Sequence, residues 1–224
     1  MIGVGTSLLF GRKAGKAGPP IPPFNKAMVD AWFMSRLSNV DKPSSIRGVK
    51  GNEMQLKNFA FTSESGFGEG NYEGGLVFDG VDDYGICTGL PILDDYTVIC
   101  RRALENNAKN VVASKSVVAG NGAFIFEYGN NATYSFSKYT SGLAVNLKDS
   151  VSYQTKNSYN GSTITAGSTD DTDTLTLGII RERDSRLLKG AIYYFALYNK
   201  SLTPEEIETE KERLNEEWLK RKTE

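Results

Sequence analysis

Short apolar runs separated by turn residues recur along most of the chain, and this pattern constrains the fold more than any other feature. The runs are rich in β-branched and aromatic residues, and glycine, asparagine, aspartate or serine stands between them. In chain order they are Met28–Met34, Met54–Phe61, Leu76–Phe78, Tyr84–Cys87, Tyr96–Cys100, Val111–Ala113, Ala123–Tyr128, Thr133–Phe136, Leu143–Leu147, Ser152–Thr155, Ser162–Thr165, Thr174–Ile180 and Ala191–Tyr198. About a dozen short strands without a helical period among them predict an all-β fold, an antiparallel two-sheet sandwich over residues 26–200.

The stretch Gly75–Cys87 is the centre of this pattern. Two apolar runs, Leu76–Phe78 and Tyr84–Cys87, flank the sequence Asp-Gly-Val-Asp-Asp at positions 79–83. Asp-Gly between apolar runs is a strong local hairpin signal, because glycine adopts a positive φ without a Cβ clash. The stretch therefore predicts a tight β-hairpin with acidic residues at its tip.

Residues 201–224 predict a C-terminal α-helix that caps the sandwich. The segment begins with the pattern of a hydrophobic staple, an N-cap, a helix-starting proline and a capping box. Leu202 and Ile207 are placed for the hydrophobic staple and Thr203 is the N-cap. Pro204 is the helix-starting proline, and Glu206 completes the capping box. One narrow apolar stripe follows, made by Ile207, Leu214, Trp218 and Leu219.

The last predicted strand, Ala191–Tyr198, is apolar on both faces. Strand alternation puts its even-numbered residues on one face and its odd-numbered residues on the other. We therefore expect this strand to be buried between the opposite sheet and a further element, with the helix pinned across it.

Two parts of the sequence resemble a known signature. Residues 78–84, Phe-Asp-Gly-Val-Asp-Asp-Tyr, resemble the opening of laminin-G-like, concanavalin-A-like jelly-roll domains. Leu175–Ile180 and Leu188–Ile207 resemble their closing signature, in which a strand ending in Leu-Gly is followed by a Gly-initiated last strand and a cap of the form Leu-Thr/Ser-x-Glu-Glu-Ile. The resemblance implies a lectin-glucanase jelly roll. Gly122–Glu127 and Tyr153–Gly161 are similar to jelly-roll proteins of tailed phages and mobile elements of gut bacteria, which implies a tail or capsid-associated virion component.

Residues 1–25 predict an extended N-terminal arm. Glycines spaced through this segment disfavour a helix, and a proline-rich run favours extended geometry. Leu8, Leu9 and Phe10 would associate if left in water, so we expect them to dock on a partner together with the basic Arg12. A disordered tail fits the same composition.

The composition excludes several kinds of site. The chain has no histidine, which removes the Ser-His-Asp triad, the Cys-His pair and every zinc site that contains histidine. A net charge of −1 gives no field that would attract nucleic acid. No run approaches the roughly 20 apolar residues of a membrane span. Because basic residues follow the apolar N-terminal stretch, we expect no secretory signal peptide and synthesis in the cytoplasm of a bacterial host.

A retaining glycosidase of this sandwich needs two carboxylates roughly 5 Å apart. Glu127 stands alone between Phe126 and Tyr128, and alternation places it on the outward, solvated face of its strand. We therefore predict no catalytic residue and no enzyme activity. A glycan hydrolase is the least favoured alternative.

Three acidic clusters, at residues 82–83, 94–95 and 170–173, are typical of turns and do not match a calcium-binding EF-hand loop. We predict no metal site and no cofactor, with calcium as the alternative. Cys87 and Cys100 are interpreted as two buried thiols, and a disulfide stays open if their strands pair.

The stretch between residues 128 and 161 has the composition of a recognition surface. Tyrosine supplies a large contact area at a low entropy cost, and asparagine and serine supply adaptable hydrogen bonds. The predicted ligand-binding residues are Tyr134, Tyr139, Tyr153, Tyr159 and Asn131. An ordinary polar outer sheet is the alternative.

Together these features predict a non-catalytic, lectin-like binding or adhesion module that recognises surface glycans, as a component of a phage virion or an extracellular surface. A purely structural assembly protein without a sugar site is the alternative. The expected partners are other virion or surface proteins and a glycan, with no nucleic acid, and the chain is expected to act as a homo-oligomer or within a larger assembly.

Overall fold

The computed structural model describes residues 23–35, 37–105, 111–116, 122–129, 131–167, 170–180 and 186–223. The predicted arm lies outside these residues except for positions 23–25, so Leu8, Leu9, Phe10 and Arg12 are not among them. In the described part of the chain, no helix combines the length and the apolar character that a membrane crossing requires.

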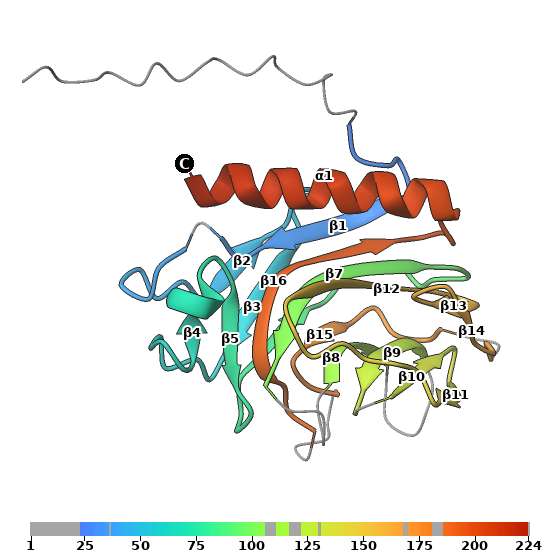
Figure 1. The fold of residues 1–224 in the computed structure, drawn as a ribbon, viewed down its shortest axis with the longest axis horizontal. Helices are drawn as coiled ribbons and strands as arrows, with labels where there is room; N and C mark the ends of the chain where they lie inside the picture. The colour runs from blue at the N-terminus through green and yellow to red at the C-terminus, as the bar shows by residue number, and fades with distance from the viewer. Residues whose placement is uncertain are drawn as a thin grey trace, which may run out of the picture.

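Two antiparallel sheets pack face to face, which confirms the predicted β-sandwich (Figure 1). Sheet A has the order β14-β13-β12-β7-β16-β5-β4, with β1 also paired to β16, and sheet B has the order β11-β10-β9-β8-β15-β6-β3-β2. The elements of sheet A are β1 (Met28–Phe33), β4 (Gly66–Phe67), β5 (Leu76–Asp79), β7 (Thr97–Leu104), β12 (Ser150–Thr155), β13 (Ser158–Tyr159), β14 (Ser162–Thr163) and β16 (Lys189–Tyr198). Those of sheet B are β2 (Ser45–Arg47), β3 (Glu53–Lys57), β6 (Tyr84–Cys87), β8 (Val111–Ser116), β9 (Gly122–Tyr128), β10 (Ala132–Ser135), β11 (Lys138–Ser141) and β15 (Leu175–Leu177). A short 3-10 helix, η1 (Gly70–Tyr72), precedes β5, and the helix α1 (Pro204–Thr223) follows β16.

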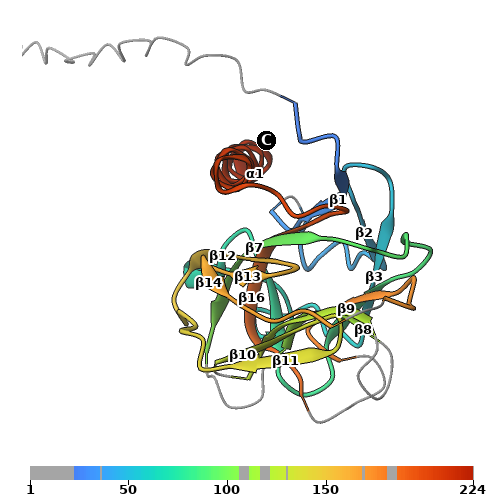
Figure 2. The same ribbon diagram turned by 90° about the vertical axis from the view of Figure 1, so that its right-hand side faces the viewer.

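Apolar side chains form two main cores, one between the sheets and one between sheet A and α1. The first includes Trp32, Phe78, Phe126 and Phe195. The second includes Tyr194, Tyr198, Leu214 and Trp218, and α1 lies across the outer face of sheet A (Figure 2). Sheet A is therefore covered on both sides, which confirms that β16 is buried on both faces.

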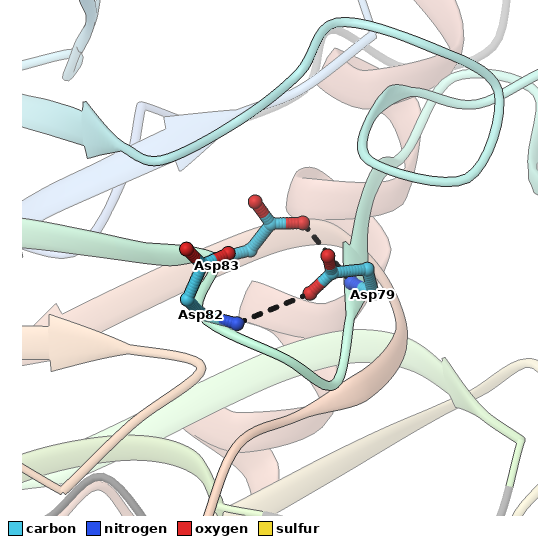
Figure 3. Close-up of side chains that lie close together, drawn as sticks. All are labelled: Asp79, Asp82 and Asp83. Atoms are coloured by element: carbon cyan, nitrogen blue, oxygen red, sulfur yellow. Dashed lines mark hydrogen bonds between the residues drawn. The ribbon is translucent and has the colours of Figure 1, made fainter.

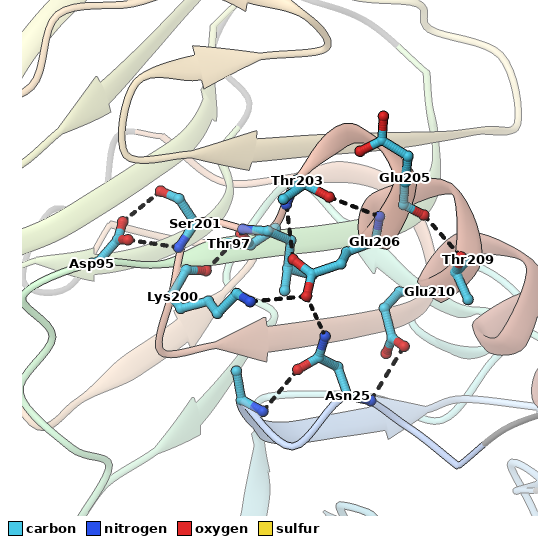
Figure 4. A network of polar contacts seen from close by, with 12 residues as sticks. Asn25, Asp95, Thr97, Lys200, Ser201, Thr203, Glu205, Glu206, Thr209 and Glu210 are labelled. Carbon is cyan, nitrogen blue, oxygen red and sulfur yellow. Dashed lines mark hydrogen bonds and ion pairs between the residues drawn. The ribbon is translucent and has the colours of Figure 1, made fainter.

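The helix begins where the sequence predicts. The Glu206 amide donates to the Thr203 hydroxyl at 3.3 Å and the Thr203 amide donates to the Glu206 carboxylate at 2.9 Å, which is a capping box. Leu202 and Ile207 are both buried, as the staple requires. Asn25 also donates to Glu206, at 3.3 Å, so the segment before β1 is fastened to the start of the helix (Figure 4).

The predicted hairpin at residues 75–87 is wrong in its pairing. β5 lies in sheet A beside β16 and β4, whereas β6 lies in sheet B beside β15 and β3. The turn at 79–83 thus crosses from one sheet to the other. Its local chemistry is as expected, since Gly80 has φ +78° and the Asp79 carboxylate accepts from the Val81 amide at 2.7 Å. An Asp-Gly signal fixes a turn, but in a sandwich each flanking strand pairs with strands distant in sequence.

Two further expectations change. Tyr193 is an extra residue at a bulge, because Ile192 pairs with Arg102 while Tyr194 pairs with Arg101. Ile192 therefore shares the inner core with the odd-numbered Phe195 and Leu197 instead of the outer face. The run Leu143–Leu147 forms no strand, although its apolar side chains still pack against the inner core.

Cys87 and Cys100 lie in different sheets, on β6 and β7, and both are free and buried. The interpretation as two buried thiols is confirmed.

Candidate functional site

The structure separates the predicted ligand-binding tyrosines into three places. Tyr134 and Tyr139 lie together on β10 and β11 of sheet B, directly opposite each other in the ladder. Tyr153 lies on β12 and packs against the core under α1, with the Lys211 ammonium 4.6 Å from its ring centre. Tyr159 lies in the core between the sheets. Asn131 is exposed immediately before β10, and its carbonyl accepts from the Leu143 amide at 2.8 Å.

Tyr128, Tyr134 and Tyr139 form one aromatic cluster, which we call the tyrosine patch. Ring centres are 4.9 Å apart for Tyr134 and Tyr139 and 5.3 Å apart for Tyr128 and Tyr134. Tyr128 meets Tyr139 edge to face at 6.4 Å. Tyr139 is 48% exposed as a residue, whereas Tyr128 and Tyr134 are half-buried. The patch therefore presents one outward ring held by two others.

An apolar base supports the tyrosine patch. Val111, Ile125 and Ile180 form a small buried cluster against which Tyr128 and Tyr134 pack. Tyr134 is paired with Ile125 across β9 and β10, so the ladder itself fixes the position of the ring. This base holds the rings of Tyr128 and Tyr134 in place at the surface of sheet B.

Glu127 is not the solvated glutamate that alternation predicts. Its carboxylate is fully buried between the sheets and accepts from Arg102 through Nε at 2.7 Å and Nη2 at 2.6 Å. The Tyr159 hydroxyl donates to the same carboxylate at 2.8 Å. Glu127 has φ +55°, in the left-handed region, which interrupts the alternation of β9 and accounts for its inward side chain.

Arg102 was the sequence signal that could have located this ion pair. It stands in the mostly apolar strand β7, beside the less buried Arg101, and a buried guanidinium requires an acidic partner. Burial lowers the pKa of Arg102, but the charge and hydrogen bonds of Glu127 outweigh it and hold the pKa above its ordinary value. Ser150 and Ser152 accept from the remaining donors at 2.5 and 2.9 Å. Arg102 and Glu127 thus form an ion pair between the two sheets. Both side chains are fully buried, so a substrate cannot contact them.

The acidic turn is the described cluster whose geometry could hold a metal ion. Carboxylate oxygens of Asp79, Asp82 and Asp83 lie within 4.8 Å of one another (Figure 3). Two of the three carboxylates already accept hydrogen bonds from the protein. Asp79 accepts from two turn amides, and Asp83 accepts from the Ser65 hydroxyl and the Asp79 amide, both at 3.0 Å. The turn thus accounts for the cluster without an ion.

The other two acidic clusters also serve the fold. Asp95 accepts from the Ser201 amide at 2.7 Å and its hydroxyl at 2.5 Å, which ties the loop before β7 to the start of α1 (Figure 4). Asp170 forms a buried ion pair with Lys115 of β8. Asp173 accepts from the Gly89 amide at 3.2 Å.

A cleft of about 310 Å³ lies beside the acidic turn, at the end of β5. The Tyr72 hydroxyl and the Lys189 ammonium both contact Glu105 in its wall, at 3.4 and 3.2 Å. The cleft is the alternative binding site to the tyrosine patch. Its lining also includes Ser63, Glu64, Val77, Phe78 and Asp79.

Solved structures share this architecture. A sialidase of Trypanosoma rangeli in complex with 2,3-difluorosialic acid gives a TM-score of 0.54 at 14% identity, over 90% of this chain and 35% of the sialidase chain. The same sialidase in complex with sialic acid gives 0.53 at 14% identity, over 86% of this chain and 33% of the other. An HCR/D mutant gives 0.50 at 12% identity, over 81% of this chain and 50% of the other. The similarity shows the fold.

These structures are compatible with a jelly-roll sandwich, and the chain spans about a third of the length of the sialidase chains. No protein-family model matches the chain, and none of the curated proteins matches it.

Proposed function

We propose that the protein is a non-catalytic, lectin-like module that binds glycans through the tyrosine patch. The observation that carries the proposal is the outward ring of Tyr139, 48% exposed and held by two further tyrosines on an apolar base. Tyr134 and Asn131, predicted from the sequence, belong to the same end of sheet B. Tyr153 and Tyr159 do not reach this surface and are left out of the proposed site.

A rigid, half-exposed aromatic ring suits a sugar. The apolar face of a pyranose can pack on the ring, while neighbouring hydroxyl and amide groups exchange hydrogen bonds with the sugar hydroxyls. Because the ladder and the apolar base already order the rings, binding loses little side-chain entropy. Sialic acid bound to the structurally similar sialidase supports sugars as the ligand class.

The buried state of Glu127 supports the non-catalytic part of the proposal. A retaining mechanism needs a second carboxylate about 5 Å away and access for the sugar. Glu127 is instead enclosed, and both of its oxygens accept from Arg102.

A place in a phage virion or on an extracellular surface is a finer proposal, supported by the sequence resemblance alone. In it, Leu8, Leu9, Phe10 and Arg12 dock on a partner subunit and the patch faces outward. A structural assembly protein without a sugar site is the competing proposal, and the binding experiment separates the two.

The test is a glycan array probed with the full chain and three variants. We expect Tyr139→Ala to weaken binding about tenfold, which corresponds to about 1.4 kcal/mol. Tyr153→Ala, under α1, and Tyr72→Ala, in the cleft, are the matched controls and should bind as the wild type does. Loss of binding in Tyr72→Ala with retention in Tyr139→Ala would move the site to the cleft. An array without any bound glycan would favour the assembly protein.

A further inference from the structure

We propose that the glycan bound at the tyrosine patch carries a carboxylate, which pairs with Arg186 while the sugar ring packs on Tyr139. This inference rests on the proposed function and narrows its ligand class. It follows from the position of Arg186, from the lack of a carboxylate partner for it among the described residues, and from the charges on the neighbouring strands.

Arg186 lies over the tyrosine patch. Its guanidinium carbon is 4.0 Å from the centre of the Tyr128 ring, close enough for a cation–π contact. A guanidinium that stacks by its flat face keeps its N–H donors directed outward around its edge. Tyr128 also contacts Tyr139, so one ligand can touch both the guanidinium and the exposed ring.

Most arginines that the structure describes already have a carboxylate partner. Those partnered arginines are Arg101, Arg102, Arg213 and Arg221. Within the described residues, Arg47 and Arg186 lack one, and of these two only Arg186 stacks on an aromatic ring. Arg186 is therefore a preoriented cation whose donors are available to a ligand.

The strands around the patch add positive charge. In the described parts of β9, β10 and β11, the acidic residue is Glu127, which is buried and neutralised by Arg102. Lys138, on β11 one residue before Tyr139, is exposed. A ligand approaching this face thus meets cationic side chains. A planar carboxylate fits the guanidinium fork, because its two oxygens accept two parallel N–H bonds.

The experiment compares carboxylated oligosaccharides with their methyl esters, which keep the ring and remove the charge. Binding of oligogalacturonates and of the same oligomers as methyl esters is measured by calorimetry at low and high salt. We expect the acid to bind at least about fivefold more tightly than the ester, and the difference to shrink as salt screens the pair. Arg186→Gln should abolish this preference, measured as the ratio of the acid and ester dissociation constants of the same variant.

Two further variants sharpen the test. Arg186→Lys keeps the charge but loses the planar fork, so it should retain only part of the preference. Lys138→Gln is the matched removal of a neighbouring charge and should change the preference less than Arg186→Gln does.

The outcomes separate this inference from the proposed function. Equal binding of acid and ester, abolished by Tyr139→Ala, would overturn the carboxylate inference and leave the glycan module standing. A preference for the acid that survives Arg186→Gln would also overturn it. The carboxylate inference would also be overturned if neither oligomer binds and no carboxylated glycan on the array binds more strongly than its ester. An array without any bound glycan would overturn the proposed function too.

Discussion

Arg102 and Glu127 are both fully buried, so each charge depends on the other for its counter-charge. Removing one partner of such a pair leaves an uncompensated charge in the interior, whereas replacing both by apolar residues can be nearly neutral. The pair therefore fixes how the two sheets face each other.

We predict that Glu127→Gln lowers the free energy of unfolding by about 3–5 kcal/mol. Urea denaturation measures the change, and Glu212→Gln, on the exposed face of α1, is the control and should stay within about 0.5 kcal/mol of the wild type. The double variant Arg102→Met with Glu127→Leu should recover most of the loss. A Glu127→Gln protein as stable as the control would contradict a structural role for the pair.

Asp83 gives the folded protein a pH dependence. Burial raises its pKa to about 6 from an ordinary value of 3.8, against the opposing effect of its hydrogen bonds with the Asp79 amide and Ser65. Because the folded state binds this proton more tightly than the unfolded chain does, protonation favours folding. The contribution of Asp83 to stability is therefore fully present below about pH 4 and is lost as the pH rises through about 6.

We predict that Asp83→Asn, which does not titrate, flattens the stability curve between about pH 4 and 7. Urea unfolding at a series of pH values measures the curve. Asp82→Asn, at the exposed neighbouring position, removes only the smallest of the causes that raise the Asp83 pKa, so it should keep the pH dependence and shift it slightly to lower pH. If the stability curve of Asp83→Asn overlays that of the wild type, the pH dependence comes from another group and the prediction is wrong.

At the scale of elements, Trp218 is one of the buried residues that seat α1 on sheet A. The indole of Trp218 donates to the Gly74 carbonyl at 2.9 Å, packs edge to face on Tyr193, and lies 4.2 Å from the Arg101 guanidinium carbon. Arg101 is itself held by a bidentate ion pair with Asp149. Trp218 thus joins the helix to β7 and β16.

We predict that Trp218→Ala costs about 3–5 kcal/mol of unfolding free energy. Leu219→Ala is the control, because this neighbouring side chain is 52% exposed and its loss should change stability by less than about 0.5 kcal/mol. Thermal unfolding followed by circular dichroism compares the two. Equal costs would mean that the helix is not held by its buried stripe.

Local signals predicted α1 well and strand pairing poorly, for a physical reason. Thr203 and Glu206 satisfy each other within one turn, so sequence alone specifies the start of the helix. The residues around Gly80 specify a turn, but the partner of β5 is β16, far along the chain. The positive φ of Glu127 and the bulge at Tyr193 likewise depend on the opposite sheet and the neighbouring strand, which alternation does not include.

The candidate site was predicted in part for the same reason. Tyr134 and Tyr139 are brought together by a short ladder between consecutive strands, which a sequence can indicate. Arg186 reaches Tyr128 from the loop before β16, a contact that only the folded sheet creates.

At the scale of the whole molecule, the segment before β1 is fastened to the end of the sandwich by Asn25. Its amide donates to Glu210 at 3.2 Å and its side chain donates to Glu206.

We predict that deleting residues 1–22 leaves the Tm nearly unchanged, because the sequence indicates an arm outside the sandwich. Extending the deletion through residue 27 should lower the Tm by several degrees, since about 1 kcal/mol corresponds to roughly 2–4 °C for a chain of this size. Calorimetry compares the Tm values of the two truncated proteins. If deleting residues 1–22 prevents folding, the arm belongs to the core and the prediction is wrong.

The central place of β16 in sheet A has a consequence for how the chain is made. β16 is the last strand in the sequence, yet it pairs with β1, β5 and β7. Until the ribosome has released it, these three strands lack their shared partner, and the inner core cannot close. Such long-range pairing is slow to form. The nascent chain therefore completes its sandwich only after residues 189–198 have left the ribosome, and a chain arrested before residue 189 exposes the edges that β16 would cover.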